Sequence, residues 1–273
     1  MNGAGNDFVM LDNRSGTLSL NQEQIARLCD RHRGVGADGL LLVENGENTN
    51  ADFRMRYYNS DGGEAEMCGN GARCFARFAS RLASGNSGVP AFSQLSFETQ
   101  VGPIGAKLHT DQTVELAMST PHSWQPPTTL TLTEKSLEVA SLNTGVPHAV
   151  ISVKNPETLQ ELDIQKDGSA IRRHPHFAPK GTNVNFYTEL APGRLTLRTY
   201  ERGVEEETLA CGTGVVATAL VHHLKTGTPS PIQVEVQGGD TLSVSFQSSE
   251  DATFRAVTLQ GPADFVFEGQ IEI

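Results

Sequence analysis

Short apolar or alternating stretches recur along this chain, a pattern that is typical of β-strands. A helical spacing of apolar residues at Ile25, Leu28 and Cys29 predicts one helix between residues 21 and 33. The chain is therefore expected to mix β-strands with helices. The predicted strands include 8–12, 52–58, 95–98, 103–108 and 114–118, and the third and fourth of these read as a hairpin.

Two further helices are predicted by a short motif that occurs twice. Cys68 is followed by Gly-Asn-Gly and a helical run, and Cys211 is followed by Gly-Thr-Gly and a second helical run. The glycines allow a tight turn, and the first N–H groups of the following helix have no intrahelical partner. Such a helix start attracts anions and lowers the pKa of a nearby thiol. Cys68 and Cys211 are therefore candidate reactive thiols at anion-binding helix starts.

The sequence around each motif follows the same order, which indicates an internal duplication. A strand and a polar approach lead to each cysteine, and the second approach (200–210) is one residue longer than the first (58–67). Strand-like segments follow both helices. We therefore predict two halves with one cysteine each, the first formed by residues 1–115 with about 261–273 and the second by residues 116–260.

Two polar segments are interpreted as connections. The stretch 121–129 is rich in Pro and Thr and is expected to pass between the halves. The stretch 163–179 is expected to be a polar connection that contains His174 and His176. No cysteine or acidic residue lies at a zinc-like spacing from these two histidines, so no metal site is predicted.

Two similar turns supply further candidates. Asn6 belongs to a glycine-rich turn before the first strand, where its amide could either form the turn or point into a pocket. His148 follows a comparable turn in the second half, and we expect it to hold the place that Asn6 holds in the first. Cys29 and Cys74 lie inside predicted helices and are expected to be inert structural residues.

Composition removes several classes of function. A net charge of −11 and a pI of about 5.2 disfavour a nucleic-acid or anionic-membrane partner. No apolar run approaches the roughly 20 residues that a membrane span needs. Met1 leads directly into Asn-Gly-Ala-Gly without a signal-peptide pattern, and four cysteines in 273 residues do not make a disulfide framework. We therefore expect a cytoplasmic protein.

Two sulfur atoms on opposite sides of one carbon would perform a definite reaction. One removes a proton while the other delivers a proton to the opposite face, so that the configuration inverts. For an amino acid, two helix starts aimed at its carboxylate would stabilise the developing enolate charge without a pyridoxal cofactor. We therefore predict a cofactor-independent inversion at an α-carbon, with Cys68 and Cys211 as the acid/base pair.

Other interpretations of the cysteines remain as alternatives. A redox pair is poorly served by the spacing of Cys68 and Cys74, and a metal site lacks a second ligand near either motif. A core role does not require Gly-X-Gly after the cysteine in two places. A thiol-based redox or binding protein is the alternative from a different class.

Seven segments of the chain together carry a family resemblance, namely 3–8, 59–62, 68–74, 145–148, 183–186, 201–203 and 210–214. With these segments the chain resembles the diaminopimelate epimerase family over nearly its whole length. The resemblance implies an α/β (α+β) fold of two pseudosymmetric domains, each a curled, mostly antiparallel sheet around a central helix, with the site in the cleft between them. It also implies a homodimeric isomerase that interconverts LL- and meso-2,6-diaminopimelate without a cofactor, for lysine and peptidoglycan.

The resemblance also implies a role for each site residue. Cys68 and Cys211 would be the base/acid pair. The carboxylate at the reacting carbon would be held by the amides of Gly69, Asn70, Gly212 and Thr213. The reacting amino group would be received by Asn6 and Glu201, with His148 close by. The distal amino-acid end would be gripped by Asn59, Asn183 and Arg202, the last acting as a carboxylate clamp.

Three departures from the family pattern affect these expectations. Val146 stands where many members have Asn before the Pro-His pair, which removes one expected distal contact. Glu205-Glu206-Glu207 replaces a shorter Gly-Glu-Thr form before Cys211, and the first strand is expected to be short because Met1 lies so close to it. The alternative on the same fold is therefore a racemase of a single α-amino acid.

Overall fold

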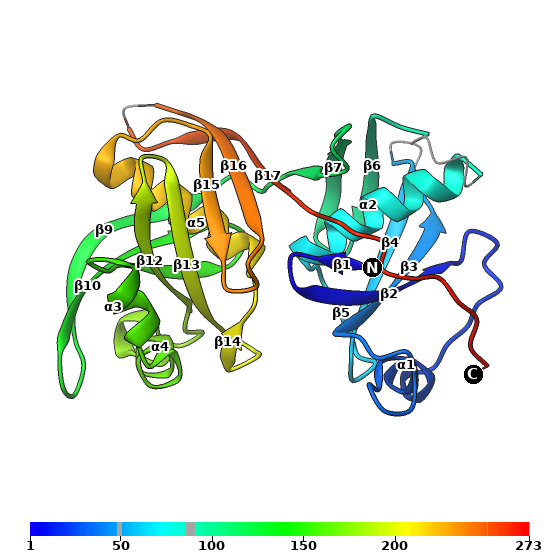
Figure 1. The fold of residues 1–273 in the computed structure, drawn as a ribbon, viewed down its shortest axis with the longest axis horizontal. Helices are drawn as coiled ribbons and strands as arrows, with labels where there is room; N and C mark the ends of the chain where they lie inside the picture. Colours follow the sequence, from blue (N-terminus) through cyan, green and yellow to red (C-terminus); the bar gives the residue numbers. More distant parts are fainter. Residues whose placement is uncertain (48–50, 86–90, 250, 273) are drawn as a thin grey trace. The chain divides into compact units, whose positions relative to one another are not determined.

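The computed structural model describes residues 1–47, 51–85, 91–249 and 251–272, in which strands outnumber helices (Figure 1). The chain divides into two compact units. Unit 1 comprises Met1–Ala117 and Gln260–Ile273, and unit 2 comprises Met118–Leu259. The mixed α/β fold class predicted from the sequence is confirmed in these units.

In unit 1 the strands curl around one long helix, α2 (Gly69–Ala83), which contacts both the first and the last strand of the unit. β2 runs parallel to β3, and β4 runs parallel to β6, whereas the other described pairs in this unit are antiparallel. The strands are β1 (Asn2–Gly3), β2 (Asn6–Asp12), β3 (Gly39–Asn45), β4 (Phe53–Asn59), β5 (Glu64–Ala65), β6 (Gln94–Thr99), β7 (Gly102–Leu108) and β8 (Val114–Ala117).

The predicted helix near residue 25 is α1 (Gln22–Cys29). Its N-cap Asn21 accepts a hydrogen bond from the backbone of Gln24, whose side chain in turn accepts one from the backbone of Asn21, so both ends of a capping box are present. Ile25, Leu28 and Cys29 pack against Leu40 and Leu42 of β3. Burial raises the pKa of the Cys29 thiol to about 11, as expected for an unreactive core residue.

Unit 2 repeats the pairing pattern of unit 1 around α5 (Gly212–Thr226). β11 runs parallel to β12, and β13 runs parallel to β15, as β2 and β4 do with their partners in unit 1. This repetition is the internal duplication that the motifs indicate. The strands are β9 (His122–Thr131), β10 (Ser136–Asn143), β11 (Pro147–Ser152), β12 (Asn183–Ala191), β13 (Arg194–Glu201), β14 (Glu206–Thr208), β15 (Ile232–Val236), β16 (Thr241–Ser248) and β17 (Phe254–Gly261).

The strand register corrects one expected correspondence between the halves. Phe8 on β2 lies opposite Gly39 on β3, and His148 on β11 lies opposite Asn183 on β12. Gly39 in turn lies opposite Asn59, and the pairing of Val184 with Tyr200 brings Asn183 to Glu201. His148 is therefore the counterpart of Phe8, and the expectation that it holds the place of Asn6 is wrong. Turn composition suggested that match, but strand pairing fixes which residue faces the helix.

Two segments expected to be connections are regular structure. Residues 122–131 form β9, which pairs with β10 inside unit 2 instead of passing between the halves. Pro126 and Pro127 lie between its paired residues Gln125 and Thr128, at a register shift where no ladder hydrogen bond from their nitrogens is needed.

The second of these segments is largely helical. Residues 164–172 form α4 (Ile164–Arg172), whose N-cap Asp163 accepts a hydrogen bond from the backbone of Lys166. α3 (Pro156–Glu161) precedes it and is capped by Asn155. Leu159, Ile164 and Ile171 bury the apolar faces of both helices in the core of unit 2. The Asn-Pro and Asp-Ile starts were the signals that could have predicted them.

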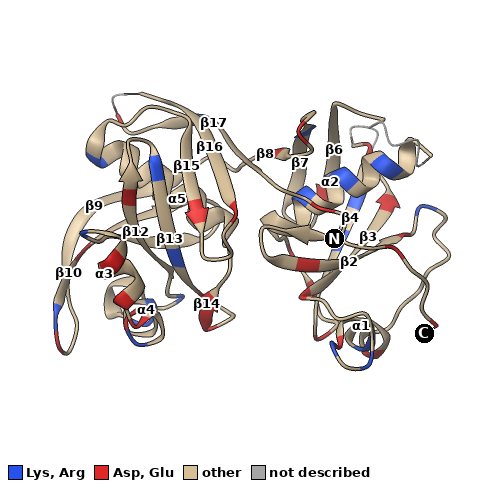
Figure 2. Ribbon diagram, in the orientation of Figure 1, with Lys and Arg blue, Asp and Glu red and all other residues tan. Residues whose placement is uncertain are grey.

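The C-terminal segment lies along α2 in unit 1. Arg73 Nε donates to the carbonyl of Pro262 (3.1 Å), and Arg77 Nη1 donates to the carbonyl of Ala263 (2.6 Å). Arg81 Nη2 forms an ion pair with Glu268 (2.7 Å). These arginines recur every four residues and so share one face of the helix, along which Figure 2 shows basic segments. This ladder of three arginines holds residues 262–268 against the helix that begins after Cys68.

Candidate active site

Cys68 is the N-cap residue of α2, with an extended backbone (φ −135°, ψ 120°) and a carbonyl that accepts from the Ala72 amide at 2.8 Å. Its side chain is partly exposed. A Cβ built on Gly69 would meet no atom within 4 Å among the described residues, whereas a Cβ on Gly71 would lie 3.2 Å from Leu41. The first glycine therefore leaves the helix start open, and the second lets the helix approach the sheet.

A chain of polar side chains supports this helix start. Asn70 Nδ2 donates to Asn6 Oδ1 (2.6 Å), and Asn6 Nδ2 donates to Asp38 Oδ2 (2.9 Å). On the other side, Arg73 Nη2 donates to Asn70 Oδ1 (3.0 Å). Arg73 is fully buried in the first turns of α2. The structure thus brings the predicted residues Asn6 and Asn70 together.

Asn59 lies at the same end of the sheet. It closes β4 opposite Gly39, the residue after Asp38, and its side chain is exposed. Its backbone forms a tight turn, because its amide donates to Gly63 (2.9 Å) and its carbonyl accepts from Gly62 (2.9 Å). Asn59 is therefore exposed on unit 1, across the strand pair from the residue that follows Asp38.

Cys74, by contrast, lies in the interior of α2. Its side chain is fully buried, and burial raises the pKa of its thiol to about 12. A Cβ on Gly3 would lie only 3.0 Å from its sulfur. The thiol stays protonated near neutral pH, which suits the structural role expected for it.

Cys211 begins α5 with the same geometry as Cys68. It is the N-cap residue (φ −123°, ψ 106°), and its carbonyl accepts from the Val215 amide at 2.9 Å. Only 7% of its surface is exposed. The hydroxyl of Thr213 lies 3.6 Å from its sulfur, and the hydroxyl of Thr144 donates to the Thr213 carbonyl (2.9 Å). Gly212 and Thr213 thus form the first turn of α5, and the hydrogen bond from Thr144 holds this turn in place.

His148 is fully buried behind this helix start. Its Nε2 lies 2.9 Å from the Thr213 hydroxyl, and its Nδ1 lies 3.0 Å from the side-chain nitrogen of Asn185. Burial lowers its pKa to about 3, with a further contribution from the nearby Arg202 charge. His148 is therefore neutral at physiological pH and acts as a hydrogen-bonding group.

Glu201, Arg202 and Asn183 meet at the end of β13. Burial raises the pKa of the Glu201 carboxyl, and the nearby Thr208 side chain partly opposes that effect. Asn183 Oδ1 accepts from the Arg202 backbone amide (2.8 Å), while its Nδ2 donates to the Pro147 carbonyl (3.2 Å). Asn183 therefore holds the backbone of Arg202 in place.

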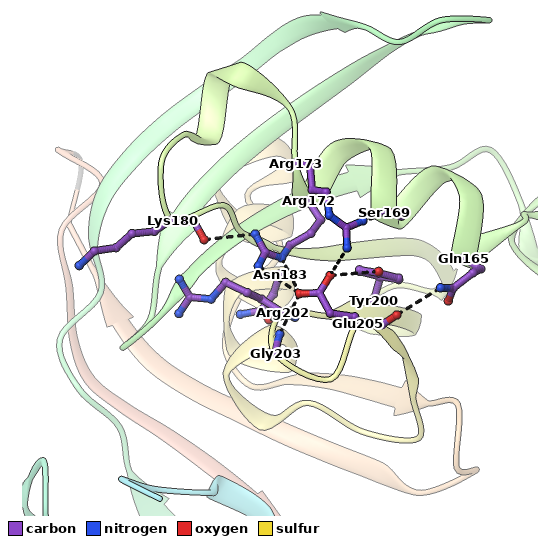
Figure 3. Close-up of polar contacts among 10 residues, drawn as sticks. All are labelled: Gln165, Ser169, Arg172, Arg173, Lys180, Asn183, Tyr200, Arg202, Gly203 and Glu205. Atoms are coloured by element: carbon purple, nitrogen blue, oxygen red, sulfur yellow. Dashed lines mark hydrogen bonds and ion pairs between the residues drawn. The ribbon is translucent and has the colours of Figure 1, made fainter.

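Figure 3 shows how the acidic loop before Cys211 is held. The Glu205 carboxylate pairs with Arg172 (3.0 Å) and Arg173 (2.8 Å), and it accepts from the Gly203 amide (3.2 Å). The Gly203 amide and Arg172 keep the pKa of Glu205 below its ordinary value. Arg202 extends away from this carboxylate (Figure 3), which leaves its charge outside the pairing.

The second acid of that loop is also engaged within unit 2. Glu207 makes a two-point ion pair with Arg198, with both nitrogen–oxygen distances at 2.7 Å. Arg198 also donates to three carbonyls at the end of α3, so the pair ties the loop to that helix. The acids that depart from the family pattern therefore serve as loop anchors, and only Glu206 is fully on the surface.

Sequence reasoning missed two buried polar residues, Arg73 and Asn185. Both lie inside the quoted motifs, but their partners are distant in sequence, at Pro262 for Arg73 and at His148 for Asn185. A polar residue at a strand or helix position that should face the core was the available signal. The polar networks behind Cys68 and Cys211 depend on them.

Other features of the described residues lie apart from these helix starts. A cavity of about 700 Å³ in unit 1 is lined by residues such as Arg77, His109 and Phe265 and by none of the predicted site residues. His174 accepts from the backbone of His176 (3.2 Å) in a short turn. No cluster of metal-ligating side chains occurs within the described ranges. None of the helices there has the length and apolar character that a membrane crossing requires.

Comparison with known proteins identifies the family. A sequence model described as "Diaminopimelate epimerase" matches residues 1–124 and 140–266. The chain is 41% identical to a diaminopimelate epimerase of Chlorobaculum tepidum, with 100% of both chains covered. It is 41% identical to one of Aquifex aeolicus, with 99% of this chain and 96% of that one covered.

A solved structure shows the same fold. It is a PhzF-family phenazine biosynthesis protein of Bacillus anthracis, which superposes with a TM-score of 0.71 at 16% identity, covering 100% of this chain and 95% of the other. At that identity the likeness concerns the fold alone. The full-length sequence matches carry the assignment further, and the chain belongs to the diaminopimelate epimerase family.

Proposed function

We propose that this protein is a cofactor-independent epimerase that interconverts LL- and meso-2,6-diaminopimelate, a reaction of lysine and peptidoglycan precursor synthesis. The observation that carries the proposal is the full-length 41% identity to relatives named diaminopimelate epimerase. The two helix starts agree with it, because each presents a cysteine as N-cap followed by Gly-X-Gly. In this proposal Cys68 and Cys211 exchange the α-proton, one as thiolate base and the other as thiol acid.

The remaining residues divide into three roles. The helix-start amides of Gly69, Asn70, Gly212 and Thr213 bind the carboxylate beside the reacting carbon and stabilise its enolate-like charge. Asn6 and Glu201 receive the reacting amino group. The distal amino-acid end is bound by Asn59, Asn183 and Arg202. The arginine is supported in this role by its orientation away from Glu205 and by the Asn183 bond that fixes its backbone.

Proton exchange in deuterated water tests the mechanism directly. Starting from LL-diaminopimelate, a two-base enzyme places solvent deuterium on the meso product, while unreacted substrate stays protiated at early times. Cys68→Ala and Cys211→Ala should each lower the epimerisation rate by roughly 10²–10⁴-fold, because a general acid or base is lost. Cys29→Ala, which removes a buried thiol from α1, is the matched control and should keep its turnover number.

The same assay separates the competing functions. Exchange of a simple α-amino acid with negligible turnover of LL-diaminopimelate would identify a racemase instead. Full activity in both cysteine variants would contradict the two-thiol mechanism. The homodimer and the cytoplasmic location expected from the sequence belong to this proposal, and light scattering after size-exclusion chromatography checks the first. Cell fractionation checks the second.

A further inference from the structure

Three polar side chains of unit 2 form a continuous hydrogen-bonded path to the sulfur of Cys211. Asn185 Nδ2 lies 3.0 Å from His148 Nδ1, and His148 Nε2 lies 2.9 Å from Thr213 Oγ1. Thr213 Oγ1 then lies 3.6 Å from Cys211 Sγ. Asn185 and His148 are fully buried, so bulk water does not compete with their contacts. The direction of every hydrogen bond in the path can be worked out from its first member.

The amide of Asn185 has one possible orientation. One of its side-chain N–H groups donates to the carbonyl of Ala149 (3.0 Å), which can only accept. Its Oδ1 accepts from the hydroxyl of Thr199 (3.1 Å). Rotating the amide by 180° would place two oxygens against each other at Ala149. The second N–H group of Asn185 therefore points at His148 Nδ1.

That contact fixes the tautomer of His148. Because Nδ1 accepts from Asn185, it carries no hydrogen. The ring is neutral, since burial lowers its pKa to about 3. Its single hydrogen is then on Nε2, which donates to the oxygen of Thr213. The threonine oxygen is thereby occupied as an acceptor on the side of the histidine.

The hydroxyl hydrogen of Thr213 is consequently turned toward the cysteine. A hydroxyl has one hydrogen to donate. Among the described residues, the hydroxyl of Thr213 also contacts Cys211 Sγ at 3.6 Å, which is within hydrogen-bonding reach for sulfur. The backbone at this point is also held, because Thr144 donates to the Thr213 carbonyl. A hydrogen bond donated to a sulfur stabilises its negatively charged form.

We propose that the Thr213 hydroxyl is a dedicated hydrogen-bond donor to the Cys211 thiolate, and that Asn185 and His148 are positioning residues which fix its direction. The catalytic meaning of this donor rests on the proposed function, in which Cys211 exchanges a proton with substrate. The donor itself is a property of unit 2 and is measured without substrate. The inference and the proposed function can therefore fail separately.

Alkylation of Cys211 as a function of pH measures the donor. A small alkylating reagent is added to the full-length protein across a pH series, and mass spectrometry follows the peptides containing Cys211 and Cys68. Thr213→Val removes the hydroxyl at nearly constant shape and should raise the midpoint of Cys211 alkylation by about one pH unit, the effect of one charge-assisted hydrogen bond. Thr213→Ser keeps the hydroxyl and should restore the midpoint.

Internal and matched controls isolate the effect. The Cys68 midpoint in the same samples should not move. Thr218→Val removes another buried hydroxyl from α5 and should leave Cys211 unchanged. Charged groups near the path include Arg202, which acts on His148, and Glu201, and both are the same in all variants. An unchanged Cys211 midpoint in Thr213→Val would overturn the proposal.

Nitrogen-15 spectra of the histidine rings test the two positioning residues. We expect the His148 signals of the unmodified protein to show a neutral ring with the hydrogen on Nε2 from pH 5 to pH 8. Asn185→Asp places an acceptor against Nδ1, so the hydrogen should move to Nδ1 and the Cys211 midpoint should rise as in Thr213→Val. If the ring of the unmodified protein carries its hydrogen on Nδ1, the path runs the other way and the proposal is wrong.

Discussion

Both α2 and α5 begin at an N-cap cysteine with extended backbone, continue through Gly-X-Gly and span 15 residues. Their surroundings differ at equivalent positions. The third residue of α2, Gly71, packs against Phe8 and Leu41, which are apolar. The third residue of α5, Gly214, packs against Asn185, which bonds His148. At this third position α2 therefore packs on apolar side chains, whereas α5 packs on a buried polar path.

Further along the two helices the polar side chains are on α2, and the equivalent positions of α5 are apolar. α2 carries Arg73, Arg77 and Arg81, which bind the C-terminal segment. Counted from the cysteines, the equivalent residues of α5 are Val216, Leu220 and Leu224. Each unit thus supports its helix start with a polar network. In unit 1 the network continues along the arginine face of α2, whereas in unit 2 it leads to the thiol of Cys211. The duplicated backbone leaves the two sulfurs in chemically different sites.

The loops that lead to the two cysteines share one type of hydrogen bond but differ in their ion pairs. Gln22, the first residue of α1, donates from its side-chain amide to the Asp61 carbonyl, and Gln165 of α4 donates to the Glu205 carbonyl, both at 3.2 Å. The first loop is also held by its own turn, in which the Asp61 side chain accepts from the Gly63 amide. The second loop adds the ion pairs of Glu205 with Arg172 and Arg173.

The largest expected effect concerns the pH dependence of unit 2. Burial lowers the pKa of His148 from 6.5 to about 3. Between these two pH values the unfolded chain binds a proton at this histidine and the folded chain does not. This difference does not reduce the free energy of unfolding above pH 6.5, and it reduces it increasingly as the pH drops toward 3. By pH 4 the loss reaches about 3 kcal/mol. Urea unfolding of the unmodified protein and of His148→Gln between pH 4 and pH 8 measures it.

The His148→Gln variant shows how stability depends on pH when this histidine is absent. His148→Gln is less stable at pH 7 because it disturbs the bonds to Thr213 and Asn185, but it lacks the titration. The difference in unfolding free energy between the two proteins should therefore shrink as the pH falls. Unit 1 has Phe8 at this position and contributes no such term. Parallel curves for the two proteins would show that His148 is not kept neutral by the fold.

The second effect tests the polar network of unit 1. Arg73→Met leaves the buried acceptor Asn70 Oδ1 and the partly buried carbonyl of Pro262 without their charged donor, which should cost about 2–3 kcal/mol. That loss corresponds to a fall of roughly 4–10 °C in the melting temperature. Arg81→Met removes a more exposed arginine of the same face, whose pair with Glu268 is worth under about 1 kcal/mol. Equal shifts for the two variants would contradict the ladder described for α2.

The sequence predicted what local pattern determines. Gly-X-Gly after a cysteine and the alternation of residues 52–58 were sufficient for α2, α5 and β4. Pro-rich composition misled at β9, since two prolines can sit in a strand at a register shift. The polar partners of Arg73 and Asn185 lie 189 and 37 residues away, and no local pattern encodes such pairings. The same limit made His148 look equivalent to Asn6, because register depends on strands far apart in the chain.

A smaller effect distinguishes the two helix starts by a single methyl group. In Gly214→Ala the new Cβ would lie 2.4 Å from Asn185 Oδ1, and three hydrogen bonds prevent Asn185 from moving. The cost should be about 1–3 kcal/mol. In Gly71→Ala the closest atom is the end of Leu41 at 3.2 Å, which can yield. Alanine's better helix propensity then offsets most of the strain, to within about 1 kcal/mol. Thermal unfolding of both variants measures the difference, and similar losses would mean that Asn185 is free to shift.

The smallest effect separates the two approach loops. Glu205→Gln removes the ion pairs with Arg172 and Arg173 but keeps an acceptor for Gly203. Because this carboxylate is one-third exposed, the stability loss should stay under about 1 kcal/mol. The loop carries Arg202, so its looser position should appear mainly as a rise of about two- to fivefold in KM for LL-diaminopimelate, with kcat nearly unchanged. Asp61→Asn is the counterpart in unit 1 and keeps its single acceptor for Gly63, so its KM should not change. A KM for Glu205→Gln equal to that of the unmodified enzyme would mean that Gln165 and the Asn183 bond to Arg202 hold the second loop without the added charges, and the two approaches would then differ in length alone.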